Sequence, residues 1–260
     1  MKTLRQGSTG EDVISLQQLL SEYGYLVRVD GIFGTQTHEA VCNFQKEAKL
    51  VADGIVGPKT WLALNGLACE VALPDYAFAA KTLDVEIAAI RAVHQVEAGG
   101  SSGFLPDGRP VILFEGHIFW EQLKRFGFDP TRFQEGNKDI LFPVWNQKSY
   151  QGGTAEYDRL NRACVINHKA ALMSASWGMF QIMGFNYGLC RFYSVYKYAA
   201  AMYLSHDNQL NAFVSLLQNT GMNLLLRECQ WAEFARRYNG LRYKENRYIE
   251  KLQVAYLQFK

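Results

Sequence analysis

Apolar residues recur at helical spacing along most of this 260-residue chain. One stripe runs from Val13 to Leu20, another from Val41 to Ala48, and a helix is expected to open at 81–84 with Thr82 or Asp84 as its cap. In 104–119 the pattern changes, because the hairpin-type turn Asp107-Gly108 precedes an apolar run at 111–114. The later helical patterns cover 155–175, 194–219, 222–237 and 243–258. These patterns predict a mainly α chain whose larger part is α+β, with one small β-hairpin.

An internal repeat marks the first 65 residues as a separate unit. VDGIFGTQTHEAV (29–41) and ADGIVGPKTWLAL (52–64) align without a gap, 23 residues apart. In each copy an Asp-Gly turn leads into a helix, which Thr35 is expected to cap in the first copy and Pro58 to open in the second. Two copies are too few for a solenoid, so we expect a three-helix unit with two matching loops.

This unit contains a set of short motifs in a fixed order: LRQG (4–7), GEDV (10–13), LQ (16–17), LL (19–20), both DGIxG loops, FQ (44–45) and TW (60–61). With these motifs it resembles the peptidoglycan-binding domain of cell-wall hydrolases. The resemblance implies a shallow groove beside the loops that binds the wall glycan or stem peptide. The alternative is that the loops only cap helices. The expected binding residues are Asp30, Gly31, Phe33, Asp53, Gly54 and Trp61.

The stretch RAVHQVEAGGSSGF (91–104) places a glutamate at the end of a predicted helix. Ile90, Val93 and Glu97 lie on one face of that helix, so the carboxyl group is expected to be partly buried among apolar residues. Burial and the negative end of the helix macrodipole both raise the pKa of a carboxyl group. Glu97 is therefore a candidate general acid, and the alternative is a solvated surface glutamate.

Two further motifs follow in order, SWGMFQIMG (176–184) and FARRYNG (234–240). With Glu97 they form a trio that resembles the lysozyme-like superfamily, including lytic transglycosylases and goose-type lysozymes. ILFEGHIFW (112–120) and SWGMFQIMGFN (176–186) bring the chain closer to the N-acetylmuramidase family of modular phage endolysins, over roughly residues 84 to 258. That family implies cleavage of the β-1,4 bond between N-acetylmuramic acid and N-acetylglucosamine.

The resemblance also assigns roles to individual residues. Glu97 becomes the catalytic acid, Gly178 lets a sugar ring approach the backbone, and Gln181 hydrogen-bonds to the substrate. Tyr238 and Asn239 orient the acid and bind an acetamido group. Many relatives have Ser directly after the acid, whereas this chain has Ala98, and neither Ser101 nor Ser102 can be assigned that serine's role.

Glycoside hydrolysis usually needs a second carboxylate. Glu115 is preferred, because the preceding apolar strand would hold it in place, and Asp107 is the alternative. A turn Asp commonly serves its own local hydrogen bonds. His117 lies two residues beyond Glu115, where it either holds that carboxylate or bonds to backbone.

Composition narrows the choice of partners. A net charge of +2 is too small to indicate nucleic acid, and five scattered cysteines without a CxxC pair predict reduced thiols. The start lacks the apolar core of a signal peptide, and no apolar run is long enough to span a membrane. We expect a monomer without cofactor, metal or obligatory membrane partner. It would be made in the host cytoplasm and act on bacterial peptidoglycan in the periplasm after release, to lyse the host.

The resulting prediction has three parts: a peptidoglycan-binding domain (1–66), a linker (67–83) and a lysozyme-like muramidase domain (84–260). A lytic transglycosylase and a non-catalytic wall-binding protein remain as alternatives. A zinc peptidase would need metal ligands, and although His94 and Glu97 share a helix, the chain has no HExxH motif. A basic run that includes Arg247 and Lys251 could dock on anionic wall polymers or lipids, or form a solvated helix face.

Overall fold

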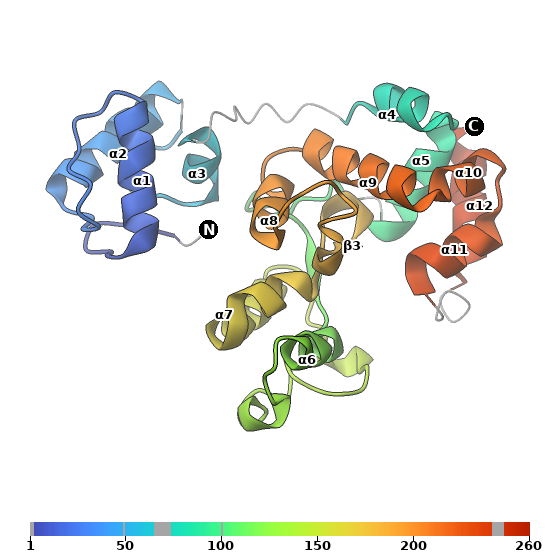
Figure 1. Ribbon diagram of the computed structural model, residues 1–260. Coiled ribbons are helices and arrows are strands. Elements are labelled where there is room, and N and C mark those ends of the chain that lie inside the picture. The colour runs from blue at the N-terminus through green and yellow to red at the C-terminus, as the bar shows by residue number, and fades with distance from the viewer. Residues whose placement is uncertain (1–2, 49, 65–73, 100, 241–246) are drawn as a thin grey trace. The chain divides into compact units, whose positions relative to one another are not determined.

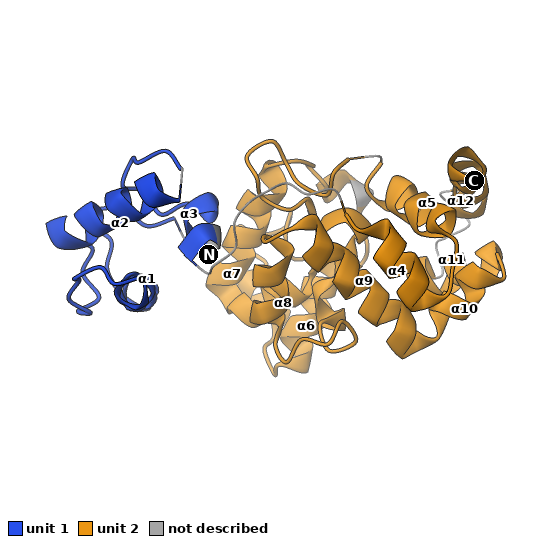
Figure 2. Cartoon of the chain, turned by 90° about the horizontal axis from the view of Figure 1, so that it is seen from above, with its two compact units in different colours: residues 1–71 blue, residues 72–260 orange. Residues whose placement is uncertain are grey.

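The computed structural model describes residues 3–48, 50–64, 74–99, 101–240 and 247–260. The chain divides into two compact units, Met1–Val71 and Ala72–Lys260 (Figure 2). Each unit has a hydrophobic core of its own. The mainly helical fold with a small antiparallel sheet agrees with the prediction (Figure 1). The described cysteines, Cys42, Cys164, Cys190 and Cys229, are free thiols, and Cys69 lies outside the described residues.

The first unit is the expected three-helix module. Its helices are α1 (Glu11–Glu22), α2 (Thr35–Glu47) and α3 (Pro58–Leu64), and its core includes Phe33 and Trp61. Pro58 opens α3 as predicted. The prediction of Thr35 as a cap was wrong, because Gly34 is the N-cap of α2 and makes no side-chain bond.

The two loops of the repeat are each fixed by a buried glutamine. Gln17 Nε2 donates to the Asp30 carboxylate at 3.0 Å, while its Oε1 accepts from the backbone N–H of Asp30 and Gly31. Gln45 does the same in the second copy, with bonds to the Asp53 carboxylate and the Gly54 N–H. Each glutamine also bonds to a loop carbonyl and a helix threonine, at Ile32 and Thr37 or at Ile55 and Thr60. The repeat therefore encodes one loop-to-helix anchor, used twice.

The second unit begins earlier than the predicted domain. Residues 67–73 of the predicted linker lie outside the described residues, but Tyr76–Leu83 forms helix α4. Ala79, Ala80 and Leu83 of this helix are buried in the core of the second unit, so this part is not linker. The expected caps of the next helix were also wrong. Asp84 ends α4 in a left-handed conformation, and Thr82 bonds back to the Phe78 carbonyl.

Several predicted helices are divided in the structure. The pattern at 194–219 forms two helices, because Ser205 caps a new one by accepting from the Asn208 N–H at 3.1 Å. The pattern at 222–237 is likewise split, and 243–246 lie outside the described residues. The helices are α5 (Ile87–Glu97), α6 (Gly116–Arg125), α7 (Ala155–Met173), α8 (Val195–Met202), α9 (His206–Thr220), α10 (Met222–Arg227), α11 (Trp231–Asn239) and α12 (Tyr248–Phe259).

The sheet has three short antiparallel strands in the order β1 (Ile112–Phe114), β2 (Ala175–Trp177) and β3 (Ile182–Met183). The predicted turn exists, closed by Leu105 N–H to Arg109 O at 2.7 Å and flanked by an isolated Phe104–Pro110 bridge. However, the apolar run after it pairs with β2, with Leu113 opposite Ser176. This long-range pairing places Glu115, the residue directly after β1, beside the strand that carries the SWGMFQIMG motif, and its N–H donates to the Ser174 carbonyl at 2.9 Å.

Candidate active site

A cavity of about 790 Å³ in the second unit brings together most of the site residues predicted for the muramidase domain. Its lining includes residues from the end of α5, the start of α6, the β2–β3 turn, the end of α11 and the start of α12. The predicted residues among the lining are Glu97, Glu115, Gln181, Tyr238 and Asn239.

Glu97 is the last residue of α5 and is half-buried at the cavity wall. Ile90 and Val93, on the same face, are fully buried, as the helical spacing predicts. Burial raises the pKa of Glu97 to about 7, although a hydrogen bond from Tyr248 acts in the opposite direction. The carboxyl group can therefore retain a proton near neutral pH, which is the requirement for a general acid.

Tyr248, at the start of α12, is the hydrogen-bond partner of Glu97. Tyr248 is almost fully buried. This burial, and to a smaller extent the nearby charge of Glu97, holds the pKa of Tyr248 well above its ordinary value. The phenol therefore stays protonated and donates to Glu97 Oε1, which leaves Oε2 to carry a proton. Sequence reasoning missed this residue, which lies 151 positions from Glu97 and belongs to no recognised motif.

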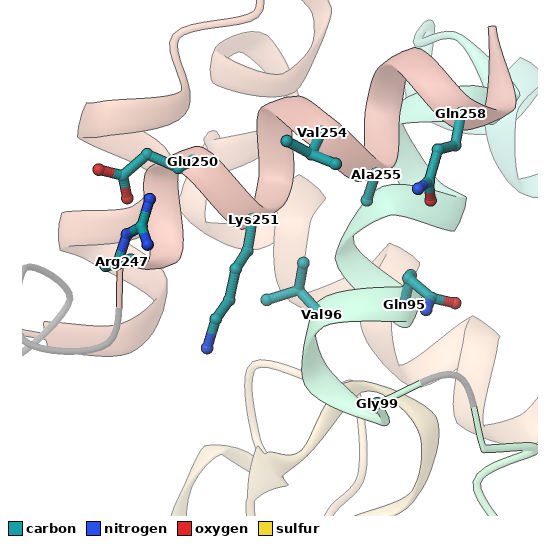
Figure 3. Close-up of a pocket in the computed structure, with 9 residues that line it drawn as sticks. All are labelled: Gln95, Val96, Gly99, Arg247, Glu250, Lys251, Val254, Ala255 and Gln258. Atoms are coloured by element: carbon teal, nitrogen blue, oxygen red, sulfur yellow. The ribbon is translucent and has the colours of Figure 1, made fainter.

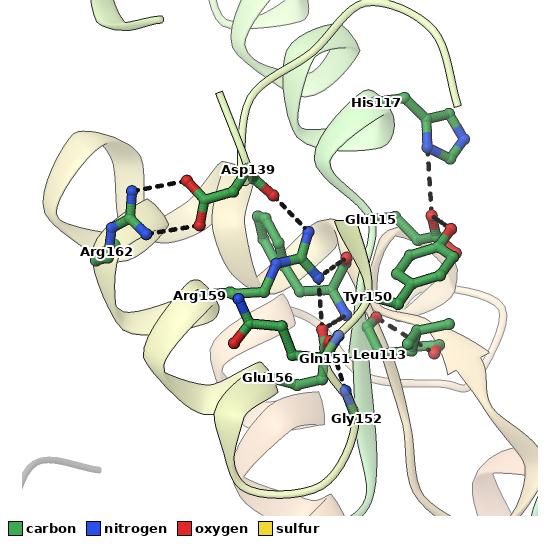
Figure 4. Close-up of polar contacts among 12 residues, drawn as sticks. Leu113, Glu115, His117, Asp139, Tyr150, Gln151, Gly152, Glu156, Arg159 and Arg162 are labelled. Atoms are coloured by element: carbon green, nitrogen blue, oxygen red, sulfur yellow. Dashed lines mark hydrogen bonds and ion pairs between the residues drawn. The ribbon is translucent and has the colours of Figure 1, made fainter. Parts of the chain in front are cut away.

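Glu115 lies at the N-terminal end of a helix, whereas Glu97 lies at a C-terminal end. It is the N-cap residue of α6, next to the positive end of the helix macrodipole, which favours a negative charge. Tyr150 Oη donates to Glu115 Oε2 at 2.5 Å, and His117 Nδ1 lies 3.2 Å from the same oxygen (Figure 4). The contact with His117 was one of the two predicted possibilities, whereas Tyr150 was not predicted.

A buried ion pair fixes the backbone around Glu115 and Tyr150. Glu156 and Arg159 lie 2.7 Å apart, and their side chains are at most 1% exposed. Glu156 accepts from the N–H of Phe114 at 2.9 Å, and Arg159 donates to the Phe114 carbonyl at 2.9 Å. The other oxygen of Glu156 accepts from the N–H groups of the two residues that follow Tyr150, at 2.7 and 3.1 Å (Figure 4). One carboxylate thus holds both segments that meet at Glu115.

Comparison with protein-family profiles identifies the family to which the chain belongs. The profile described as N-acetylmuramidase matches residues 86–260, which is more than half of the chain. The chain belongs to the N-acetylmuramidase family. Members of this family are glycoside hydrolases that act on peptidoglycan. A second profile, described as a putative peptidoglycan binding domain, matches residues 9–64.

Among solved structures, this N-acetylmuramidase is similar to the Burkholderia AP3 phage endolysin. The two share 42% sequence identity and a TM-score of 0.65, and the match covers 99% of each chain. Two curated relatives match a short segment of the chain. Identity is 48% over 63 residues with the N-acetylmuramoyl-L-alanine amidase CwlM of Mycobacterium tuberculosis, which is 24% of this chain and 16% of that protein. It is 45% over 62 residues with the zinc D-Ala-D-Ala carboxypeptidase of Streptomyces albus G, which is 23% of this chain and 24% of that protein.

Some predicted residues of the muramidase domain serve the fold. Gly178 does not line the cavity, and a Cβ there would lie 2.5 Å from the Gln209 side chain, so the glycine makes room for Gln209. Gln181 lines the cavity, but its amide bonds to Ser176 Oγ at 2.7 Å and to the Gly178 carbonyl at 2.8 Å. These bonds fix the β2–β3 turn. Tyr238, which was expected to orient the acid, donates instead to the Phe180 carbonyl at 2.6 Å. The hydrogen bond to Glu97 comes from Tyr248.

Asp107 lies outside the lining of the cavity. Its carboxylate accepts two bonds from the Arg109 guanidinium, at 2.6 and 2.8 Å, and closes the turn. Burial by itself would raise the pKa of Asp107, but the hydrogen bonds and positive charge of Arg109 together lower it below its ordinary value. The structure therefore gives Asp107 a local role in the turn.

The residues expected to bind the wall in the first unit are mostly structural. Phe33 and Trp61 are at most 5% exposed, while Asp30 and Asp53 bond to Gln17 and Gln45. The exposed apolar residue of each loop is the one after the Asp-Gly pair, with Ile32 at 56% and Ile55 at 40% exposure. In the described ranges, no helix is long and apolar enough to cross a membrane, and no three His, Cys, Asp or Glu side chains are grouped as a metal site would require.

Proposed function

We propose that this N-acetylmuramidase is a phage endolysin that hydrolyses the β-1,4 bond between N-acetylmuramic acid and N-acetylglucosamine. The observation that carries the proposal is the placement of two carboxyl groups in one cavity. Glu97 ends a helix and has its pKa raised to about 7, while Glu115 precedes a helix whose macrodipole favours an anion. Glycoside hydrolysis needs one protonated and one ionised carboxyl group across the bond to be broken.

In this mechanism Glu97 gives its proton to the glycosidic oxygen as the bond to C1 of muramic acid breaks. The sugar left behind develops oxocarbenium character, and Glu115 stabilises that charge or takes a proton from the attacking water. Tyr248 holds Glu97 in place through Oε1, and Tyr150 holds Glu115 through Oε2. Asn239, exposed at the rim of the cavity, remains available for an acetamido group.

The first unit is proposed to bind peptidoglycan through the exposed faces of its two loops, with Ile32 and Ile55 as the contact residues. Binding there raises the concentration of glycan strands near the cavity of the second unit. The proposed setting is lysis of the bacterial host, with the enzyme acting on the wall after release from the cytoplasm.

The test is Glu97→Gln, assayed by release of reducing ends from purified peptidoglycan. We expect the rate to fall by about 10²–10⁴-fold, since this is the usual contribution of a general acid. Glu121→Gln, an exposed glutamate of α6 paired with Lys124, is the matched control and should keep the wild-type rate. Full activity in the Glu97 variant would refute its proposed role. Products lighter by one water, which carry 1,6-anhydro ends, would identify a lytic transglycosylase.

A further inference from the structure

A second cavity of about 510 Å³ lies between the end of α5 and one face of α12, beside the catalytic cavity (Figure 3). We call it the α5–α12 groove. Val96 and Lys251 line both cavities, so the groove begins at the wall that carries the proposed acid. The linings also adjoin along the chain, because Val96 directly precedes Glu97, and Arg247 of the groove directly precedes Tyr248 of the catalytic cavity.

The lining of the groove combines three kinds of chemistry. Val96, Val254 and Ala255 form an apolar floor, and the amides of Gln95 and Gln258 lie at one end (Figure 3). Arg247 and Lys251 supply two positive charges against the single negative charge of Glu250. As far as the described ranges extend, neither cation forms an ion pair with another residue, so both charges can meet a ligand.

We propose that the α5–α12 groove binds the stem peptide carried by the muramic acid whose bond is cleaved. This inference rests on the proposed function, because it takes peptidoglycan as the substrate and Glu97 as the acid. The peptide is attached through a lactyl ether at C3 of the same ring that loses its substituent at C1. The peptide therefore begins only a few covalent bonds from the reacting C1 atom. A groove next to the acid lies where that peptide would leave the sugar ring.

The chemistry of a stem peptide matches that of the groove. Its backbone amides can bond to glutamine side chains, its short alanine side chains suit an apolar floor, and its free carboxylates suit Arg247 and Lys251. A bare glycan strand is uncharged apart from its lactyl carboxylates, so it would use the two cations less. The groove then acts as a site that reads the peptide substituent, while the catalytic cavity reads the sugars.

The experiment compares two soluble substrates with the full-length chain. One is peptide-bearing glycan, and the other is the same glycan after an amidase has removed its stem peptides. Val254→Asp introduces a negative charge on the groove floor, and Gln253→Asp, exposed next to it but outside both cavities, is its matched control. Arg247→Gln removes a groove cation, and its control is Lys81→Gln, an exposed lysine of α4. The first unit is the same in every variant, so its contribution cancels.

We expect Val254→Asp to lower kcat/KM on peptide-bearing glycan by about tenfold, as for loss of a modest binding contact, with less than about twofold change on the peptide-free strand. Arg247→Gln should lose about two- to fivefold on the first substrate only, and higher salt should reduce the difference because an exposed charge contact is screened. Both control substitutions should leave the two substrates as in the wild type.

Other results would overturn the proposal in distinct ways. Equal losses on both substrates would mean that the groove holds the glycan itself, and no loss beyond the controls would mean that it holds no part of the substrate. If the wild type releases reducing ends from neither substrate, the proposed function fails. If the wild type cleaves only the peptide-bearing strand, Val254→Asp and Gln253→Asp are compared on that strand alone. A loss in Val254→Asp that Gln253→Asp does not show would support binding in the groove, and equal rates would overturn it.

Discussion

Glu97 and Glu115 differ most in the end of a helix that each occupies. Glu97 follows the apolar face of α5 into its last turn, where both burial and the macrodipole oppose a negative charge. Glu115 stands before α6 and receives a hydrogen bond from Tyr150. The same side chain type is thereby suited to two different tasks, and neither task requires a metal or a cofactor in the proposed mechanism.

At Glu115, the Gln variant tests the second carboxylate. Glu115→Gln keeps the shape but cannot carry a negative charge, so we expect the rate of reducing-end release to fall by about 10²-fold or more. Asp107→Asn is the matched control, and because an exposed turn contact contributes little, its rate should stay within about twofold of wild type. A larger loss for Asp107→Asn than for Glu115→Gln would contradict the assignment.

The pH dependence tests the protonated state of Glu97. The rate should decline as pH rises through about 7, because the acid then loses its proton. A donated hydrogen bond stabilises the carboxylate and lowers its pKa, so Tyr248→Phe should raise that pKa and move the decline to higher pH. Tyr256→Phe removes a similar phenol of α12 that bonds to Glu86 instead, and it should leave the profile in place. A Tyr248→Phe profile unchanged or displaced toward lower pH would contradict this role.

At the scale of elements, short strands are held by contacts from elsewhere in the chain. β1 has three residues, yet its last one, Phe114, has both backbone groups bound by the Glu156–Arg159 pair of α7. The same pair holds the segment after Tyr150. Since Tyr150 and the end of β1 both position Glu115, α7 supports the site although its side chains do not reach the cavity.

Removing one member of that pair should be costly. Arg159→Met leaves the buried charge of Glu156 without its partner, so we expect the free energy of unfolding to fall by about 3–5 kcal/mol. Arg162→Met is the matched control on the same helix, because Arg162 pairs with Asp139 at the surface and such pairs contribute about 0–1 kcal/mol. Chemical denaturation of the two variants measures the difference, and equal losses would contradict the argument.

At the scale of the whole molecule, two separate cores support two separate tasks. The first unit has its own buried cluster, and the profile of a peptidoglycan binding domain covers most of it. The second unit contains all of the proposed catalytic groups. This division allows the wall-binding and cleavage functions to be tested independently.

Deleting residues 1–71 should therefore affect only substrates that the first unit can bind. On intact sacculi we expect the rate to fall by about tenfold or more, because the effective concentration of glycan is lost. On short soluble glycan the rate should match that of the full chain. Sedimentation with sacculi measures the binding of each protein to the wall. An undiminished rate on sacculi would show that the first unit contributes nothing to cleavage of the intact wall.

The features that could be predicted from the sequence were local ones. Helical spacing identified the face of α5 that ends in Glu97, and the repeat identified a three-helix module, because both depend on residues a few positions apart. The break within 194–219 was harder to predict, because the buried positions of α8 and α9 continue one apolar periodicity.

The side chains that surround the site come from distant parts of the chain, and long-range packing brings them together. Tyr248 reaches Glu97 from 151 positions away, and Gln209 fills the space above Gly178 that had been assigned to a sugar. Phe33 and Trp61 proved to be core residues, although their motif suggested a binding surface. Contacts of this kind depend on how helices pack, and packing joins residues whose separation along the chain carries no periodic signal.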